Sequence, residues 1–329
     1  MITPLLFIAS AILLIVAAEL FTNAVEWAGY RMKLGAGATG SLLAAIGTAL
    51  PETVVPVVAL ATSSPSADQV ATGAVLGAPF LLLTLAVAAT GIAVLLRRSN
   101  PRLVVNPAQA RRDLGVFIGG FSLALVCIVL PAPLRIAGGV LLLAGYAGYV
   151  VLTLRRRVPV EEMPQPLHIV RWRGNEPHHL LIALQLLIAI VLLILGSPLF
   201  VSALDRTASA LSFSPLILAL IIVPMATELP ESLNSVLWVR THDDGLAFGN
   251  VAGSAAFQAT VLGFIGVVFT TWRPGLNGLI GAFIALGTAL FLLAVLWRGR
   301  AHGVVLVIAA VPWLAYVIAQ IVTGGRIGA

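Results

Sequence analysis

The sequence predicts an all-helical integral membrane protein, with ten transmembrane helices arranged as two five-helix repeats of inverted topology. Three observations lead to this fold class. Of the 329 residues, 60% are hydrophobic and 10% are charged, with a mean hydropathy of +1.05. Apolar runs of membrane-spanning length recur along the chain, and one motif occurs once in each half. Because soluble domains carry about 25% charged residues, the composition excludes an ordinary soluble globule.

Ten apolar runs are long enough to cross about 30 Å of hydrocarbon as helices. The first follows Met1 without a basic leader and continues past a cleavable length, so we expect it to be retained rather than removed as a signal peptide. Helices are expected because open sheet edges cannot be satisfied in lipid. The runs lie at 4–29, 36–62, 68–96, 113–131, 134–154, 180–204, 213–239, 245–270, 277–297 and 303–322.

Several classes of function are excluded. Cys127 is the only cysteine, which removes disulfide frameworks, zinc ribbons and redox pairs. The net charge of +6 comes from arginines in short connections rather than from a basic face with aromatic residues, so no nucleic-acid partner is expected. Neither a P-loop nor an HExxH motif occurs. We therefore predict no enzyme activity, no cofactor and no ATP site.

The basic residues set the orientation. Alternate connections carry 15 of the 19 Lys and Arg residues on one side of the membrane and four on the other. Because basic residues stay inside, the first side is expected to be cytoplasmic and both termini extracytoplasmic, in a multi-pass protein of the cell membrane. A basic, proline-rich stretch at 157–178 is the predicted cytoplasmic linker, between a first repeat at 1–156 and a second at 179–329.

Each half holds five spans, and an odd number inverts the second half relative to the first. LFTNAVE (20–26) and TALPET (48–53) match LFVSALD (199–205) and TELPES (227–232) at a constant shift of 179 residues. DQVATGAVLGA (68–78) matches DGLAFGNVAGS (244–254) at a shift of 176, and both copies keep a Gly-x-x-x-Gly pattern.

A proline stands in the middle of two equivalent spans. Pro51 and Pro230 each remove one helical hydrogen bond and clash with a carbonyl one turn earlier, so we expect kinks there. Carbonyls near 45–48, including that of Ala45, and near 224–227 are expected to be freed. Such carbonyls can bind cations.

A glutamate follows each proline directly. An intramembrane carboxylate costs on the order of 3 kcal/mol on insertion scales, so Glu52 and Glu231 are predicted to bind a cation rather than only to pack. Repeat symmetry places them near each other at the bilayer midplane. Thr48 and Thr227, one helical turn earlier, can add oxygen ligands on the same face.

The motifs GTALPET (47–53) and ATELPES (226–232) resemble the signature of the calcium/cation antiporter superfamily, in particular the sodium/calcium exchanger group. The resemblance covers nearly the whole chain. It implies two inverted repeats, termini outside, a cytoplasmic middle loop and a cation site between helices two, three, seven and eight.

The resemblance also implies ligands from a small-residue motif in helices three and eight. In helix eight this motif falls on Gly253, Ser254 and Gln258. The equivalent positions in helix three are Ala78 and Leu82, so this arm lacks the side-chain oxygens of the family pattern. The full predicted cation site is Glu52, Glu231, Thr48, Thr227, Glu228, Ser254, Gln258 and Ala45.

The implied function is sodium/calcium exchange by alternating access, with the transported cations and membrane lipid as partners and a monomer as a sufficient unit. Calcium/proton exchange is the alternative, since Glu228 adds a carboxylate near Glu231, and neighbouring carboxylates share protons. A passive cation channel or a non-transporting membrane scaffold is the alternative of another class. Helix packing alone is the structural alternative for the prolines and for Ser254 and Gln258.

Overall fold

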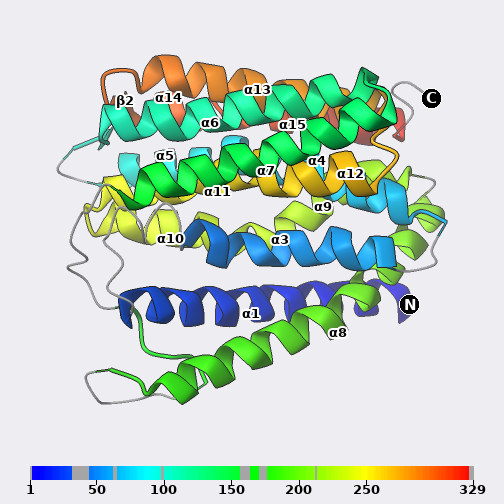
Figure 1. Cartoon of the computed structure of the whole chain (residues 1–329), viewed down its shortest axis with the longest axis horizontal. Coiled ribbons are helices and arrows are strands. Elements are labelled where there is room, and N and C mark those ends of the chain that lie inside the picture. The colour runs from blue at the N-terminus through cyan, green and yellow to red at the C-terminus, as the bar shows by residue number, and fades with distance from the viewer. Residues whose placement is uncertain are drawn as a thin grey trace.

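The computed structural model describes residues 2–31, 44–61, 65–97, 100–155, 164–169, 176–211 and 213–325. Its long helices lie side by side along one axis (Figure 1). The first half contains α1 (Ile2–Arg31), α3 (Ala44–Ala61), α4 (Ala67–Leu81), the π-helix η2 (Leu82–Ala86), α5 (Val87–Leu96), α6 (Pro107–Val126), the 3-10 turn η3 (Cys127–Val129) and α7 (Ala132–Leu154). The second half contains α8 (His179–Leu211), α9 (Pro215–Thr227), α10 (Leu229–Arg240), α11 (Asp244–Phe257), the π-helix η4 (Gln258–Leu262), α12 (Gly263–Phe269), α13 (Gly275–Val295), α14 (Gly303–Val307) and α15 (Ala310–Thr323).

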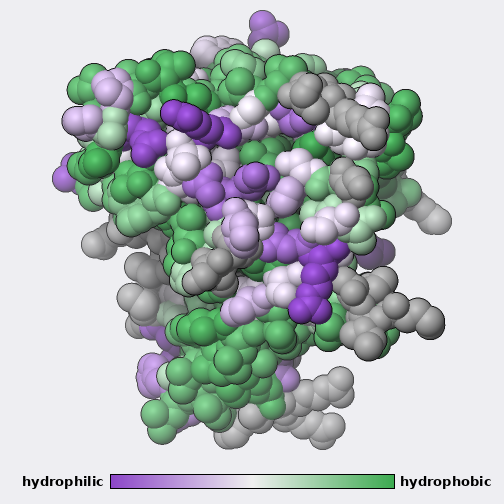
Figure 2. Space-filling view, turned by 90° about the vertical axis from the view of Figure 1, so that its right-hand side faces the viewer, coloured by the Kyte–Doolittle hydropathy of each residue, from purple (hydrophilic) through white to green (hydrophobic). Residues whose placement is uncertain are grey.

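The chain is a multi-pass membrane protein. Eight helices in the described residues are long and apolar enough to cross a bilayer, and the bent pair α9–α10 would make a ninth. The predicted span 36–62 is described only as α3, whose apolar part Glu52–Ala61 is shorter, so the number ten stays a prediction. Figure 2 shows one end of the bundle, where polar side chains gather between hydrophobic surfaces, as expected for a face outside the hydrocarbon.

The structure refines three predicted spans and adds one strand pair. The span 213–239 is two helices that meet at Glu228 with a bend of 42°. The spans 68–96 and 245–270 each contain one π-helical turn. Two short strands, β1 (Arg102–Val104) and β2 (Arg300–His302), pair antiparallel at the end that holds Arg31, Arg97 and Arg240, called here the arginine-rich end (left in Figure 1). The sequence analysis missed this ladder because three-residue strands carry no periodic signal.

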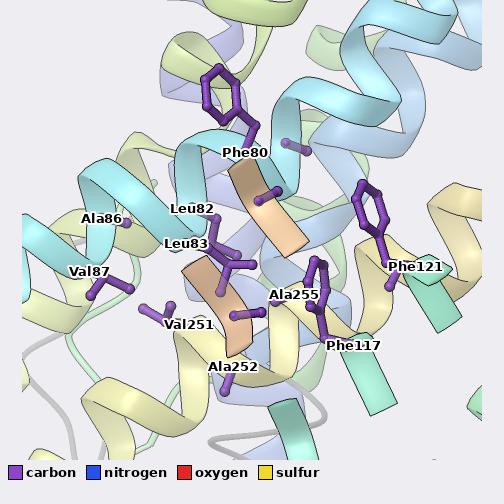
Figure 3. Packing of buried hydrophobic residues seen from close by; sticks show 14 of the residues in the cluster. Phe80, Leu82, Leu83, Ala86, Val87, Phe117, Phe121, Val251, Ala252 and Ala255 are labelled. Atoms are coloured by element: carbon purple, nitrogen blue, oxygen red, sulfur yellow. The ribbon is translucent and has the colours of Figure 1, made fainter. Parts of the chain in front are cut away.

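The segments α4–η2–α5 and α11–η4–α12 form the most buried part of the bundle. Leu82 and Leu83 of η2 lie beside α11, and Phe117 and Phe121 of α6 close the same hydrophobic cluster (Figure 3). The helices α1 and α8 pack mainly on each other at one side of the bundle (Figure 1). The core is therefore built around the two helices that carry the Gly-x-x-x-Gly pattern.

The two π-helices begin at positions related by the shift of 176, Leu82 and Gln258. In each, a threonine two residues later donates its hydroxyl hydrogen to the carbonyl four residues back: Thr84 to Phe80 and Thr260 to Ala256. A hydroxyl bonded to the preceding turn competes with the regular helical ladder, which suits a local widening of the helix. The same backbone irregularity thus occurs in both halves.

Part of the predicted linker, residues 164–169, is bound to α1. Asn23 and Trp27 donate hydrogen bonds of 3.1 and 2.7 Å to one of its carbonyls. His168 lies 3.1 Å from the Glu19 carboxylate, whose hydrogen bond raises the pKa of His168 above its ordinary value. Because the protonated ring is favoured, this contact contributes fully below the ordinary histidine pKa and is lost as the pH rises through the raised pKa.

Close packing of α4 on α9 depends on glycine. A Cβ added at Gly77 would collide with the Leu220 carbonyl oxygen and the Pro224 ring. We expect Gly77→Ala to lower the free energy of unfolding by about 1–3 kcal/mol through overpacking. The matched control is Gly119→Ala in α6, where nothing lies within 4 Å of the added atom and the gain in helix propensity is about 1 kcal/mol. Thermal unfolding in detergent measures both, and equal melting temperatures of the two variants would contradict this packing.

Candidate cation site

Two buried carboxylates and one amide meet in the interior. Glu52 follows Pro51 in α3, Glu228 joins α9 to α10, and Gln258 is the first residue of η4. The Gln258 Nε2 donates to Glu52 Oε2 and to Glu228 Oε1, each at 2.7 Å. The three residues are 2%, 0% and 1% exposed. Elements from both halves of the chain therefore converge on one amide group.

The arrangement is rich in oxygen acceptors and poor in positive charge. Since both bonded oxygens lie 2.7 Å from the same nitrogen, they are at most twice that distance apart. None of the ion pairs among the described residues involves Glu52. Glu52 Oε1 and Gln258 Oε1 are buried without a hydrogen-bond partner in the same part of the chain. Buried polar oxygens in this state are costly unless something electropositive joins them.

The local backbone explains how Glu228 reaches this position. Its N–H bonds to the Pro224 carbonyl at 2.8 Å, which closes the last turn of α9. Pro230 stands in the first turn of α10, where its missing N–H is tolerated, so a new helix begins after Glu228. The Glu228 carbonyl accepts from the Ser232 N–H and hydroxyl. By contrast, α3 continues as a helix through Pro51.

The structure places the other predicted residues around this cluster in different ways. Thr227 is buried, and its hydroxyl donates to the Val223 carbonyl at 3.2 Å, back along its own helix. Ser254 is buried one turn before Gln258, on the same face of α11. Ala78 and Leu82 are buried apolar side chains, and Leu82 belongs to the hydrophobic cluster of Figure 3.

Three predicted ligands are not characterised by this geometry. Glu231 belongs to α10, and Ala45 and Thr48 belong to α3, but their side chains lie outside the described residues. Among the residues that are described, no group of three or more His, Cys, Asp and Glu side chains comes together to hold a metal ion. Two carboxylates and an amide are what this part of the chain supplies.

The bridging hydrogen bonds of Gln258 were not anticipated from the sequence. The sequence predicted Gln258 as a ligand of the cation, not as a donor to the carboxylates. A signal was available: a long side chain with two N–H donors, opposite a carboxylate-rich motif, can bond two acceptors at once.

Membrane-spanning helices around a buried pair of carboxylates are typical of proteins that move cations across a membrane. The chain belongs to the sodium/calcium exchanger protein family. The sequence model of that family matches residues 2–155 and 181–322. It is 24% identical over 284 residues to the CaxA protein of Alkalimonas amylolytica, which is named as an antiporter, covering 81% of this chain and 80% of that protein.

Two kinds of solved structure share the fold. The H+/Ca2+ exchanger CAX matches with a TM-score of 0.75 and 18% identity, over 97% of this chain and 82% of that chain. The sodium-calcium exchanger NCX_Mj matches with a TM-score of 0.63 and 19% identity, over 97% of each chain.

The Gln258 bridge yields a prediction on stability. Replacing Gln258 by Leu removes two hydrogen bonds to charged or polar acceptors, each worth about 1.5–3 kcal/mol. We expect a clear fall in melting temperature at neutral pH in cation-free buffer. Adding Glu228→Gln to this variant restores a donor beside Glu52, so we expect the double variant to regain part of the loss. Additive losses in this double-mutant cycle would show that the amide does not couple the two carboxylates.

Proposed function

We propose that this chain is a secondary antiporter that moves Ca²⁺ by alternating access. The observation that carries the proposal is the buried meeting of Glu52, Glu228 and Gln258, in which one neutral amide bonds two carboxylates from different helices. Calcium prefers carboxylate and amide oxygens, and several such groups from different helices can replace its hydration shell. Family membership and the antiporter name of the CaxA relative support the same function.

The architecture proposed for this function is ten crossings in two inverted repeats. Two features support it: the π-helices at equivalent positions, and the two matched stretches 2–155 and 181–322, which flank the predicted linker at 157–178. Glu231, Thr48 and the Ala45 carbonyl complete the cation shell in this proposal, with Ser254 as a further hydroxyl ligand. The pair α1–α8 is the moving element, since these helices pack chiefly on each other and can slide as one unit.

For the counter-ion, this proposal favours protons. A sodium ion also needs several oxygens, and Ala78 and Leu82, at the positions equivalent to Ser254 and Gln258, are buried apolar side chains. A carboxylate binds either Ca²⁺ or a proton, so competition for Glu52 and Glu228 is sufficient for exchange. Sodium/calcium exchange is the second candidate and is favoured by the family assignment. Orientation with both termini extracytoplasmic is part of the proposal and rests on the distribution of basic residues.

Carboxylate removal tests the site. We expect Glu52→Gln or Glu231→Gln to abolish most ⁴⁵Ca²⁺ uptake into sealed proteoliposomes, because the change keeps size but removes a charged ligand. The matched control is Glu176→Gln, an exposed carboxylate paired with Arg31 at the arginine-rich end. Size-exclusion profiles check that every variant is folded. Near-normal flux in both site variants would rule out this assignment.

Coupling distinguishes the classes of transporter and the counter-ions. With protons as counter-ion, Ca²⁺ entry should raise the lumenal pH reported by a trapped dye and should continue in Na⁺-free buffer. Glu228→Ser should weaken this proton coupling more than Ca²⁺ binding. Strict dependence on Na⁺ without a pH change would identify sodium as the counter-ion. Uptake that ignores both gradients and follows only the membrane potential would identify a channel.

A further inference from the structure

A basic pocket lies beside the β1–β2 ladder at the arginine-rich end. None of its lining residues belongs to the carboxylate cluster. Its volume is about 530 Å³. It is lined by Asn100, Pro101, Arg102, Val104, Arg300 and His302. The lining includes two arginines and a histidine and no acidic residue.

The ladder itself forces these groups together. In its register, Arg102 stands opposite His302, and Val104 stands opposite Arg300. Leu103 and Ala301 point into the core, whereas the flanking residues of both strands face outward. Residues directly opposite each other have Cβ atoms about 5 Å apart, so the ladder holds the Arg102 side chain and the His302 ring side by side on its outward face, with Arg300 on the same face.

No acidic side chain of the described residues lines the pocket. The neighbouring acid, Asp244, is engaged elsewhere: it accepts from Arg97 at 2.7 and 3.2 Å and from the Val104 N–H at 2.8 Å. No ion pair in the described part of the chain involves Arg102 or Arg300. His302 Nδ1 accepts from the Val304 N–H at 3.3 Å, so its Nε2 carries a hydrogen and is a donor.

The position of the pocket near the ends of membrane-spanning helices fits a lipid headgroup. The helices α5 and α13 end at Leu96 and Val295, and β1 and β2 begin at Arg102 and Arg300. Trp297 is 54% exposed, with the Arg111 guanidinium 5.1 Å from its ring centroid. Exposed tryptophan next to arginine marks the membrane–water interface. Exposed Val104 adds an apolar contact beside the basic groups.

We propose that this pocket binds the phosphate of an anionic phospholipid from the leaflet at the arginine-rich end. The Arg102 and Arg300 guanidiniums and His302 Nε2 donate hydrogen bonds to the phosphate oxygens, and the acyl chains lie along the neighbouring apolar helix surface. Basic pockets between transmembrane helices on one leaflet are suited to such headgroups. Lipid bound here pins the two connections that carry β1 and β2, independently of which cation is transported.

Native mass spectrometry of the purified full chain tests the proposal. Phosphatidylglycerol and phosphatidylcholine are titrated separately into wild type, the double variant Arg102→Gln/Arg300→Gln, and the control Arg298→Gln, an exposed arginine outside the pocket lining. We expect the double variant to bind phosphatidylglycerol about 25-fold more weakly, the factor that two arginines near a membrane surface are worth. The control should stay within about twofold of wild type, since one exposed arginine outside the pocket is worth little here.

A second measurement distinguishes a loss of lipid binding from misfolding of the double variant. Phosphatidylglycerol should raise the melting temperature of wild type and of the control, but not that of the double variant, which should be as stable as wild type without lipid. Equal binding of both lipids, or unchanged phosphatidylglycerol binding in the double variant, would overturn the proposal. Displacement of the lipid by millimolar inorganic phosphate, with the same stabilisation, would identify a soluble anion as the ligand and overturn the lipid assignment.

Discussion

The constraint on which this structure depends is the burial of two carboxylates that share one neutral amide. Glu52 and Glu228 are removed from water, and Gln258 gives each of them one hydrogen bond. An arginine in place of the amide would neutralise one of the two carboxylates and weaken the attraction of the pair for a cation. A hydrocarbon side chain would remove one hydrogen bond from each acid. The amide lies between these extremes: it bonds both carboxylates without supplying a charge, which in the proposed function leaves them available to a cation.

Two backbone irregularities and one continuous helix bring these three side chains together. Glu228 reaches the cluster because α9 ends and α10 begins at a proline, Gln258 because a π-turn rotates the helix after Phe257, and Glu52 because α3 carries it past Pro51 without a break. Glycines at positions 73 and 77 let α4 approach the backbone of α9 closely. Side chains at these contacts would collide with the Leu216 and Leu220 carbonyl oxygens of α9 and push the two helices apart.

The sequence was sufficient for the features that follow from solvent and composition. Membrane helices, their approximate bounds and the importance of the Pro-Glu motif can be read from hydropathy and from the high cost of a carboxylate in lipid. It was not sufficient for features that arise from tertiary contacts. The β1–β2 ladder has strands too short to show a period, and the bridge from Gln258 joins residues 206 and 30 positions away. The sequence also could not predict that α3 continues through Pro51 whereas α10 begins at the equivalent proline, Pro230, because proline permits either a bend or a new helix start.

The two halves agree in backbone more closely than in side chains, and this difference has a mechanistic consequence. The π-turns at Leu82 and Gln258 occupy equivalent positions and carry the same threonine bond, yet one presents a hydrocarbon and the other an amide. A symmetric backbone allows the two halves to exchange conformations, which alternating access by inverted repeats requires. In the proposed mechanism, movement of the α1–α8 pair changes access to a site whose groups come from α3, the α9–α10 junction and η4, so the ligands do not belong to the moving pair.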